Sequence, residues 1–231
     1  MPKHGKKYLE ARAKVKKASY TLSEAIALLK ETATAKFDSS CELHLTTGID
    51  PKQADQAVRS TISLPHGTGK ELRVVAFVSD DEIKACQDAG ALEAGSEALI
   101  EKVAKGYTDF DIAVATPAMM PKLGKIAKTL GQKGLMPSPK SGTVTTEPAK
   151  TVNELKSGKV EFRNDKQGGI KNIFGKVSFK EADLEENLRT LLKAIMAAKP
   201  AALKGTFVKT VYLTTTMGPS VPVAVQELNT L

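Results

Sequence analysis

The segment TTTMGPS, Thr214 to Ser220, gathers three threonine hydroxyls, a methionine and a Gly-Pro pair at the end of a strand-like stretch. The hydroxyls could bind phosphate and ribose oxygens, and Met217 could supply one flexible apolar contact. Gly218 would admit a close partner, because it has no side chain. The alternative is a strand that runs into a turn, since Gly and Pro punctuate chains of every kind. The segment alone therefore indicates either a polar binding edge or an ordinary turn.

Two other segments have the same chemical character. In ATAKFDSS (33–40), Lys36 and Phe37 stand beside two serines where a helix gives way to a strand. Phe37 could stack on a base or ribose, and the hydroxyls could bind 2′-OH and phosphate groups; otherwise the ring simply caps the core. The segment EFRNDKQGG (161–169) ends a strand in a basic, amide-rich turn containing Arg163, Lys166 and Gly168. Either segment could also be an ordinary connection.

A third kind of segment is basic and lies in the middle of the chain. Residues 117–146 contain five lysines and no acidic residue. A helix is expected over 120–130, and it would place Lys122, Lys125 and Lys128 on one side. Glycines and prolines would then form an extended loop with exposed Ser138 and Ser141. The stretch is either a solvated helix face with a stiff loop or a surface that binds nucleic-acid backbone.

Residues suited to catalysis are sparse. Asp109 and Asp111 open an expected strand and could hold Mg²⁺, but a solvated turn explains them as well. The three histidines lack metal-ligand spacing, and HGTGKE lacks the length and the hydroxyl of a P-loop. We expect neither an enzyme nor a bound metal or cofactor. A metal-dependent enzyme using these aspartates is the alternative.

The two ends of the chain have the pattern of a sheet with one solvent-exposed face. In CELHL (41–45), apolar Cys41, Leu43 and Leu45 alternate with Glu42 and His44, and VRSTISL (58–64) alternates similarly. Further strands are expected over 159–163, 175–180 and 206–216. Helices are expected over 21–33, where Thr21 and Glu24 form a capping box, and along a stripe of apolar residues between 184 and 195.

The middle of the chain follows a different pattern. LRVVAFV (72–78) and DIAVA (111–115) are continuous apolar runs, as in strands covered on both faces. Helices are expected over 81–89, 96–105, 120–130 and 151–156, and their alternation with strands predicts a parallel sheet. The sequence therefore predicts a split α+β domain with an antiparallel-rich sheet, residues 1–67 plus 159–231. An inserted α/β, Rossmann-like three-layer domain would span 68–158.

Charge follows the same division. Residues 68–158 hold 12 Lys+Arg and 12 Asp+Glu, whereas 1–67 and 159–231 each hold 11 and 7, so all of the +8 net charge lies in the two end segments. A nucleic-acid surface on one domain explains this distribution better than a generally basic protein does. Three polar segments at strand edges in this positively charged half of the chain favour RNA as the partner. The two isolated cysteines and the lack of an apolar leader or membrane span predict a cytoplasmic protein without membrane contact.

The quoted segments also resemble a known family. ATAKFDSSCELH, SLPHGTGK, GLMPSPKSGTV, EFRNDKQGGI, KGTFVKTVYLTTTMGPS and the opening MPKHGKKY are together similar to the bacterial L-one family of large-subunit ribosomal proteins. The likeness extends over nearly the whole chain, and the extension VPVAVQELNTL departs from it. The resemblance implies a split RNA-binding domain with an inserted Rossmann-like domain on flexible connections.

The resemblance also implies partners and site residues. They are large-subunit (23S) rRNA within a mobile stalk near the exit site, the deacylated tRNA leaving that site, and the mRNA of the protein's own operon, which it would repress; no DNA partner is expected. A free translational repressor without a ribosomal role is the remaining alternative. The expected RNA-binding residues are Lys36, Phe37, Ser40, Arg163, Lys166, Gly168, Thr210, Thr214, Thr216, Met217, Gly218 and Ser220. A secondary contact with rRNA or tRNA is expected at Lys122, Lys125, Lys133 and Lys140.

Overall fold

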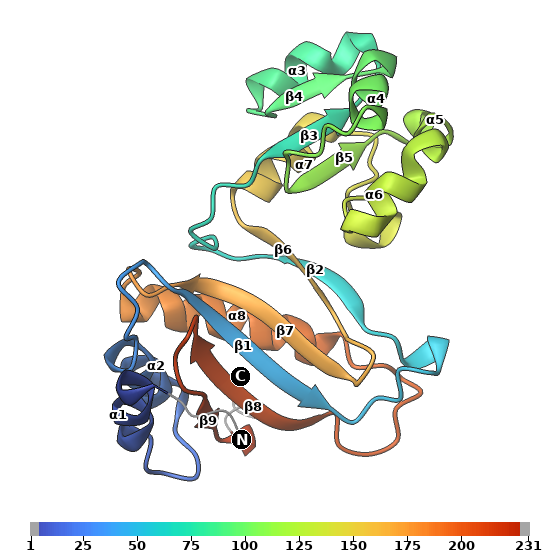
Figure 1. Cartoon of the computed structure of the whole chain (residues 1–231). Helices are drawn as coiled ribbons and strands as arrows, with labels where there is room; N and C mark the ends of the chain where they lie inside the picture. Colours follow the sequence, from blue (N-terminus) through green and yellow to red (C-terminus); the bar gives the residue numbers. More distant parts are fainter. Residues whose placement is uncertain (1–4, 227–231) are drawn as a thin grey trace. The chain divides into compact units, whose positions relative to one another are not determined.

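The structure, a computed structural model, describes residues 5–226. Residues 1–4 of the opening segment and 227–231 of the C-terminal extension lie outside the described residues. The chain divides into two compact units (Figure 1). Unit 1 comprises Met1–Gly69 and Glu161–Leu231, and unit 2 comprises Lys70–Val160. Each unit is described by itself.

Unit 1 is built on a four-stranded antiparallel sheet with the order β7-β1-β8-β9. The strands are β1 (Ser40–Thr47), β7 (Gly169–Lys176), β8 (Val208–Thr215) and β9 (Val221–Val223). In the register of the central pair, Leu43 lies opposite Leu213 and Thr46 opposite Thr210. The alternation expected for 41–45 is confirmed, since Cys41, Leu43 and Leu45 are all buried.

Helices cover one face of this sheet. α2 (Leu22–Glu31) and α8 (Glu181–Ala197) pack against the buried strand residues, and Figure 1 shows α8 running along the sheet. Thr21 accepts a hydrogen bond from the Glu24 backbone and Glu24 returns one, so the expected capping box is confirmed. The apolar stripe of α8 is also confirmed as core. α1 (Lys6–Lys14) precedes α2 and has no counterpart among the helices expected from the sequence.

Two expectations for the strands of unit 1 are wrong. The strand expected over 175–180 begins earlier, at Gly169, because residues 169–176 pair along β1. The strand around 58–64 is β2 (Arg59–Ser63), which pairs with β6 (Lys159–Arg163) in a separate two-stranded ribbon. None of its residues is fully buried, so its alternating pattern does not mark a core-facing strand.

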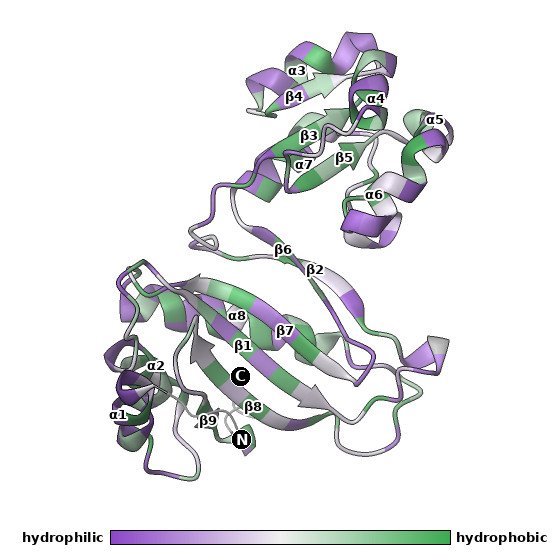
Figure 2. Ribbon diagram, viewed as in Figure 1, coloured by the Kyte–Doolittle hydropathy of each residue, from purple (hydrophilic) through white to green (hydrophobic). Residues whose placement is uncertain are grey.

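Unit 2 contains a parallel sheet with the order β4-β3-β5: β3 (Val74–Phe77), β4 (Glu93–Gly95) and β5 (Ile112–Ala115). All four β3 residues are buried, and Figure 2 shows β3 and β5 as hydrophobic segments. Helices pack on both faces, so the unit has three layers. One face is covered by α4 (Glu97–Ala104), α5 (Met120–Leu123) and α6 (Ala127–Lys133), the other by α3 (Ile83–Asp88) and α7 (Pro148–Lys156).

The helix expected over 120–130 is interrupted. A 3₁₀ turn, Gly124–Ile126, separates α5 from α6, and Gly131 and Gly134 follow in the lysine-rich stretch. Within the described part of the chain, no helix is both long and apolar enough to cross a bilayer.

Candidate RNA interface

The face of the unit 1 sheet opposite α2 and α8 carries two of the expected site residues, Thr210 and Thr214. Along β8, Thr210, Tyr212 and Thr214 alternate with buried Val211 and Leu213, so they lie on the face opposite the helices. We call this the outer face. The register places further residues of β1 and β7 on the outer face: Glu42, His44, Thr46, Lys171 and Ile173.

A first group of expected residues gathers where β1 begins and β8 ends. Thr216 donates its backbone N–H to Ser40 O (3.1 Å), and Thr216 Oγ1 accepts from Ser40 N (3.2 Å). These bonds join the segment that follows Phe37 to the segment that leads to Met217. We call the group the Phe37 cluster: Lys36, Phe37, Ser40, Thr214, Thr216, Met217, Gly218 and Ser220.

The Phe37 cluster exposes two large apolar side chains. Phe37 is 57% and Met217 is 77% solvent-exposed, although nearby Ser39 and Thr215 are buried. Exposed apolar side chains among hydroxyls are typical of a surface that contacts a partner. The ring offers a stacking surface for a base or ribose, and the thioether offers an adaptable apolar contact.

The backbone of TTTMGPS forms a tight turn. Gly218 N donates to Thr215 O (2.8 Å), and Met217 has φ 69°, a left-handed conformation that non-glycine residues seldom adopt. A Cβ at Gly218 would collide with the Thr215 hydroxyl. Packing within the turn therefore favours a glycine at position 218 independently of any partner.

The threonine hydroxyls are partly used within the chain. Thr216 Oγ1 accepts from Ser40, while Thr214 Oγ1 makes long contacts with Thr215 O and Gly218 O (3.2 and 3.3 Å). The expectation of a strand edge holds for only part of β8, which lies between β1 and β9. β9 pairs with Val211–Leu213, so Thr210 and Thr214 have no partner on that side. Thr216→Val would therefore disturb the backbone as well as any RNA contact.

The other expected residues lie at the opposite end of β1. Thr47 N donates to Gly168 O (3.1 Å), which places the β6–β7 turn beside the end of β1. Ser40 and Thr47 are seven residues apart, about 23 Å at roughly 3.3 Å per residue. We call this second group the turn cluster: Arg163, Lys166 and Gly168, with Thr210 on the adjoining part of β8. The structure thus forms two clusters joined by the outer face rather than one site.

Asp165 organises the turn cluster. Its Oδ1 accepts from Gln167 N (2.8 Å) and Gly169 N (2.7 Å), and its Oδ2 contacts Lys171 Nζ at 2.9 Å. The Lys171 ammonium and these two N–H groups lower the pKa of Asp165 from 3.8 to about 2. Gly168, with φ 78°, closes the turn. A pocket of about 480 Å³ is lined by Arg163, Asn164, Asp165, Lys166, Gly169 and Lys171.

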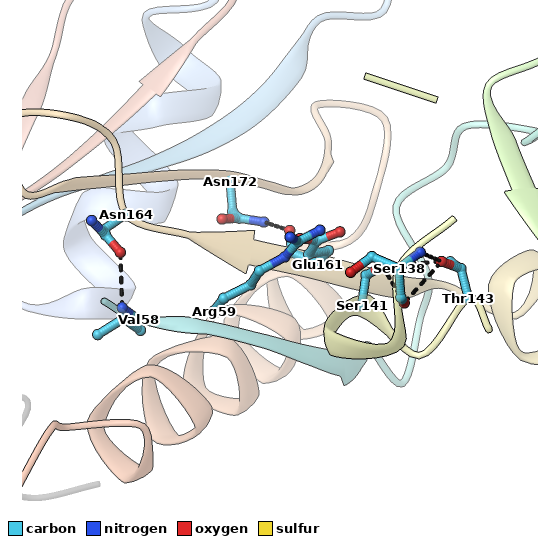
Figure 3. A network of polar contacts seen from close by, with 8 residues as sticks. All are labelled: Val58, Arg59, Ser138, Ser141, Thr143, Glu161, Asn164 and Asn172. Carbon is cyan, nitrogen blue, oxygen red and sulfur yellow. Dashed lines mark hydrogen bonds and ion pairs between the residues drawn. The ribbon is translucent and has the colours of Figure 1, made fainter. Parts of the chain in front are cut away.

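Three cations around one carboxylate give this pocket a positive balance suited to phosphate. Neighbouring backbone is fixed by amides, as Figure 3 shows. Asn164 Oδ1 accepts from Val58 N (2.8 Å), and Asn172 Nδ2 donates to Glu161 O (2.9 Å), whose carboxylate pairs with Arg59. The turn cluster is therefore held by its own chain before any ligand binds.

Sequence reasoning missed Asp165, Lys171, Ile173 and Tyr212. Tyr212 and Ile173 are each 39% exposed on the outer face, between the two clusters. The period-two spacing of Thr210, Tyr212 and Thr214 could have identified Tyr212, since all three follow one face of a strand. His44, which the alternation of 41–45 did place on the solvent-exposed face, lies opposite Tyr212 and contacts Glu42 Oε2 at 3.0 Å.

The expected secondary contact in unit 2 is less well formed. Lys122 Nζ lies 2.8 Å from Glu97 Oε1, and Lys133 contacts the Thr108 hydroxyl. Lys122 and then Lys125 lower the pKa of Glu97. Lys140 lies in the 3₁₀ turn Pro139–Ser141. Part of this positive charge is thus neutralised within unit 2.

The loop after these lysines is closed rather than extended. Ser141 is buried, contrary to expectation, and its hydroxyl donates to Ser138 O (3.0 Å) and contacts Thr143 Oγ1 (3.0 Å) (Figure 3). Thr143 Oγ1 also accepts from Ser138 N (2.9 Å). The hydroxyls of Ser141 and Thr143 therefore stabilise the loop.

Of the two aspartates considered for metal binding, Asp111 has structural partners. Asp111 contacts Lys70 Nζ (2.7 Å) and Arg73 Nε (3.1 Å), and these groups lower its pKa from 3.8 to about 2. Among residues 5–226, no group of three or more His, Cys, Asp or Glu side chains could hold a metal ion. Both cysteines are buried, and burial raises the pKa of the Cys41 thiol to about 12, so it is a poor nucleophile.

Comparison with known proteins gives a consistent result. Residues 29–219 match the model of the ribosomal protein L1p/L10e family. The chain is 53% identical to the large ribosomal subunit protein uL1 of Chloroflexus aggregans, over 99% of each chain. It is 50% identical to the uL1 protein of Deinococcus radiodurans over 97% of each, and 49% identical to that of Kosmotoga olearia over 99% of each.

Proposed function

Because the chain belongs to the ribosomal protein L1p/L10e family, we propose that it is a structural constituent of the large ribosomal subunit and binds its rRNA through unit 1. The family is one of ribosomal proteins rather than enzymes, which agrees with the expectation of no catalytic activity. The relatives named as large ribosomal subunit proteins align over nearly their whole length, so the comparison concerns the whole chain. A cytoplasmic location follows from this function.

The observation that carries the proposal is the Phe37 cluster. Phe37 and Met217 expose apolar surface beside Ser40, Thr214 and Ser220 at one end of an uncovered sheet face. RNA offers matching chemistry, with bases and riboses for the apolar groups and 2′-hydroxyls and phosphates for the polar ones. The turn cluster would bind phosphate at the other end of the same face.

The domain assignment belongs to the same proposal. Residues 1–67 and 159–231 would form the split RNA-binding domain, and 68–158 would form the inserted α/β domain. The concentration of net charge in the first of these supports the assignment. We propose further that the inserted domain moves on its two connections within the mobile stalk. Lys122, Lys125, Lys133 and Lys140 would then contact rRNA or the exit-site tRNA and assist its release.

Translational repression is the second part of the proposed function. A structured segment of the protein's own operon mRNA that resembles the rRNA site would bind the same Phe37 cluster. One surface would then serve two RNAs, and rRNA in excess would displace the mRNA. No feature of the fold favours a free repressor over a ribosomal protein.

The test is a titration with the large-subunit rRNA fragment at fixed physiological salt. Phe37→Ala and Met217→Ala should each weaken binding by about 1–3 kcal/mol, as for loss of a good short-range contact. Both side chains are exposed, so the unfolding transition should not change. Leu92→Ala, at an exposed apolar residue in unit 2, is the matched control. Unchanged affinity in both Phe37 and Met217 variants would rule out the cluster as the binding site.

A further inference from the structure

The positive charge of the first half of unit 1 is concentrated before the Phe37 cluster. Residues 5–17 contain six Lys+Arg and one acidic residue, a net charge of +5. Residues 18–67 contain four Lys+Arg and six acidic residues, a net charge of −2, although they include Lys36, Phe37 and Ser40. Within this half of unit 1, the positive charge that would attract a polyanion therefore lies in α1 and the loop after it.

The loop after α1 is fixed to the sheet. The N–H groups of Lys16 and Lys17 both donate to Tyr20 Oη, at 2.8 and 2.9 Å. Tyr20 is buried, and its backbone N–H donates to Pro222 O in β9 (3.1 Å). The cations of this loop are therefore presented from a defined backbone rather than from a free tail.

Two of the six cations are neutralised within the protein. Lys14 Nζ pairs with Glu31 Oε1 and Lys17 Nζ with Glu24 Oε1, both at 2.9 Å. The other four are exposed and have no acidic partner among residues 5–226: Lys6, Lys7, Arg12 and Lys16. We call these four the α1 cations.

The Lys14–Glu31 pair also shows where α1 lies relative to α2. Glu31 is the last residue of α2, five residues before Lys36, so the end of α1 lies beside the end of the helix that leads into the Phe37 cluster. An RNA bound at Phe37 would have flanking phosphates within reach of long lysine and arginine side chains.

We propose that the α1 cations form a second RNA contact, which binds phosphates flanking the RNA held at the Phe37 cluster without reading sequence. This inference rests on the proposed function and adds a surface to it. The two contacts have different roles in RNA binding. The α1 cations supply salt-dependent attraction, while the exposed ring, thioether and hydroxyls of the Phe37 cluster supply discrimination.

The test is the salt dependence of rRNA binding by the full chain. A variant carrying Lys6→Gln, Lys7→Gln, Arg12→Gln and Lys16→Gln should reduce the slope of log K against log salt by about 3, since each of the four phosphate contacts contributes roughly 0.7–0.9. Its preference for the rRNA fragment over a scrambled fragment should remain. Met217→Ala should do the reverse, with a lower preference and an unchanged slope.

A charge-matched control removes four other exposed lysines, through Lys84→Gln, Lys105→Gln, Lys193→Gln and Lys199→Gln. Its slope should stay within 1 of the wild-type slope. An equal fall in the control would overturn the proposal, because net charge and not the α1 segment would then govern attraction. An unchanged slope in the α1 variant would also overturn the proposal and would favour a protein, in place of RNA, as the partner of the α1 cations. Failure of the wild-type chain to prefer the rRNA fragment would instead contradict the proposed function.

Discussion

Met217 combines an exposed apolar side chain with a left-handed backbone conformation. Both features are unfavourable in the free protein. The side chain leaves apolar surface in water, and an L-residue at positive φ is strained by roughly 1–2 kcal/mol. The neighbouring Thr215 hydroxyl is buried without a hydrogen-bond partner in the described part of the chain. Strain and unsatisfied polarity often accumulate where a binding surface is built. This combination is the reason that we propose Met217 as a contact residue.

Asp165 permits a prediction about pH. Its pKa in the folded chain, about 2, lies below the ordinary value of 3.8. A lowered carboxylate pKa stabilises the fold above the ordinary value, and the contribution is lost as pH falls from about 4 towards 2. Asp165→Asn should lower the free energy of unfolding at pH 7 by about 1 kcal/mol, since the half-exposed group is screened by water.

The measurement is urea unfolding between pH 2 and pH 7. The dependence of stability on pH below pH 4 should be shallower in Asp165→Asn than in the wild type. Asp88→Asn, at an exposed carboxylate that forms no ion pair within the described residues, controls for the change in charge. A wild-type slope in the Asp165 variant would show that the turn does not depend on this carboxylate.

At the scale of elements, the Asp38 side chain helps to hold the loop between α2 and β1. Asp38 Oδ1 accepts from Ser178 N (3.1 Å) and Oδ2 accepts from Ser178 Oγ (2.9 Å), so the loop carrying Phe37 is joined to the turn that follows β7. This contact holds the aromatic ring at the surface without contributing apolar burial. The loop is thus positioned by hydrogen bonds rather than by the core.

Removing that tie should affect binding more than folding. Asp38→Ala should weaken rRNA binding by about 0.5–1.5 kcal/mol, because binding must then order the loop. Asp38→Asn keeps one amide oxygen as an acceptor and should recover part of the loss. Calorimetric titration with the rRNA fragment checks both variants. Equal affinity of Asp38→Ala and the wild type would mean that Phe37 needs no such support.

A strand or helix was predictable from the sequence where the pattern of its own apolar residues was sufficient to identify it. The alternation of Cys41, Leu43 and Leu45 and the stripe along α8 follow from burial against one partner. Pairing across the chain was not predictable, so the partner of β2 and the true start of β7 were missed. The division of the expected site into two clusters depends on the β1–β8 register, which no local pattern contains.

At the scale of the whole molecule, charge, fold and family membership agree. The net charge of residues 68–158 is zero, whereas the segments that form unit 1 carry the excess of basic residues. The three-layer unit 2 contains the expected lysines, but Lys122 already pairs with an acid in the same unit. We therefore expect unit 1 to account for most of the affinity for rRNA.

The most direct test is to crosslink the protein to RNA in cells and to identify both the peptides and the nucleotides joined. We predict crosslinks from residues 36–40 and 214–220 of unit 1 to large-subunit rRNA, with weaker ones from 6–17 and 163–171. Crosslinks confined to residues 70–160, or the absence of large-subunit rRNA among the recovered nucleotides, would contradict the account.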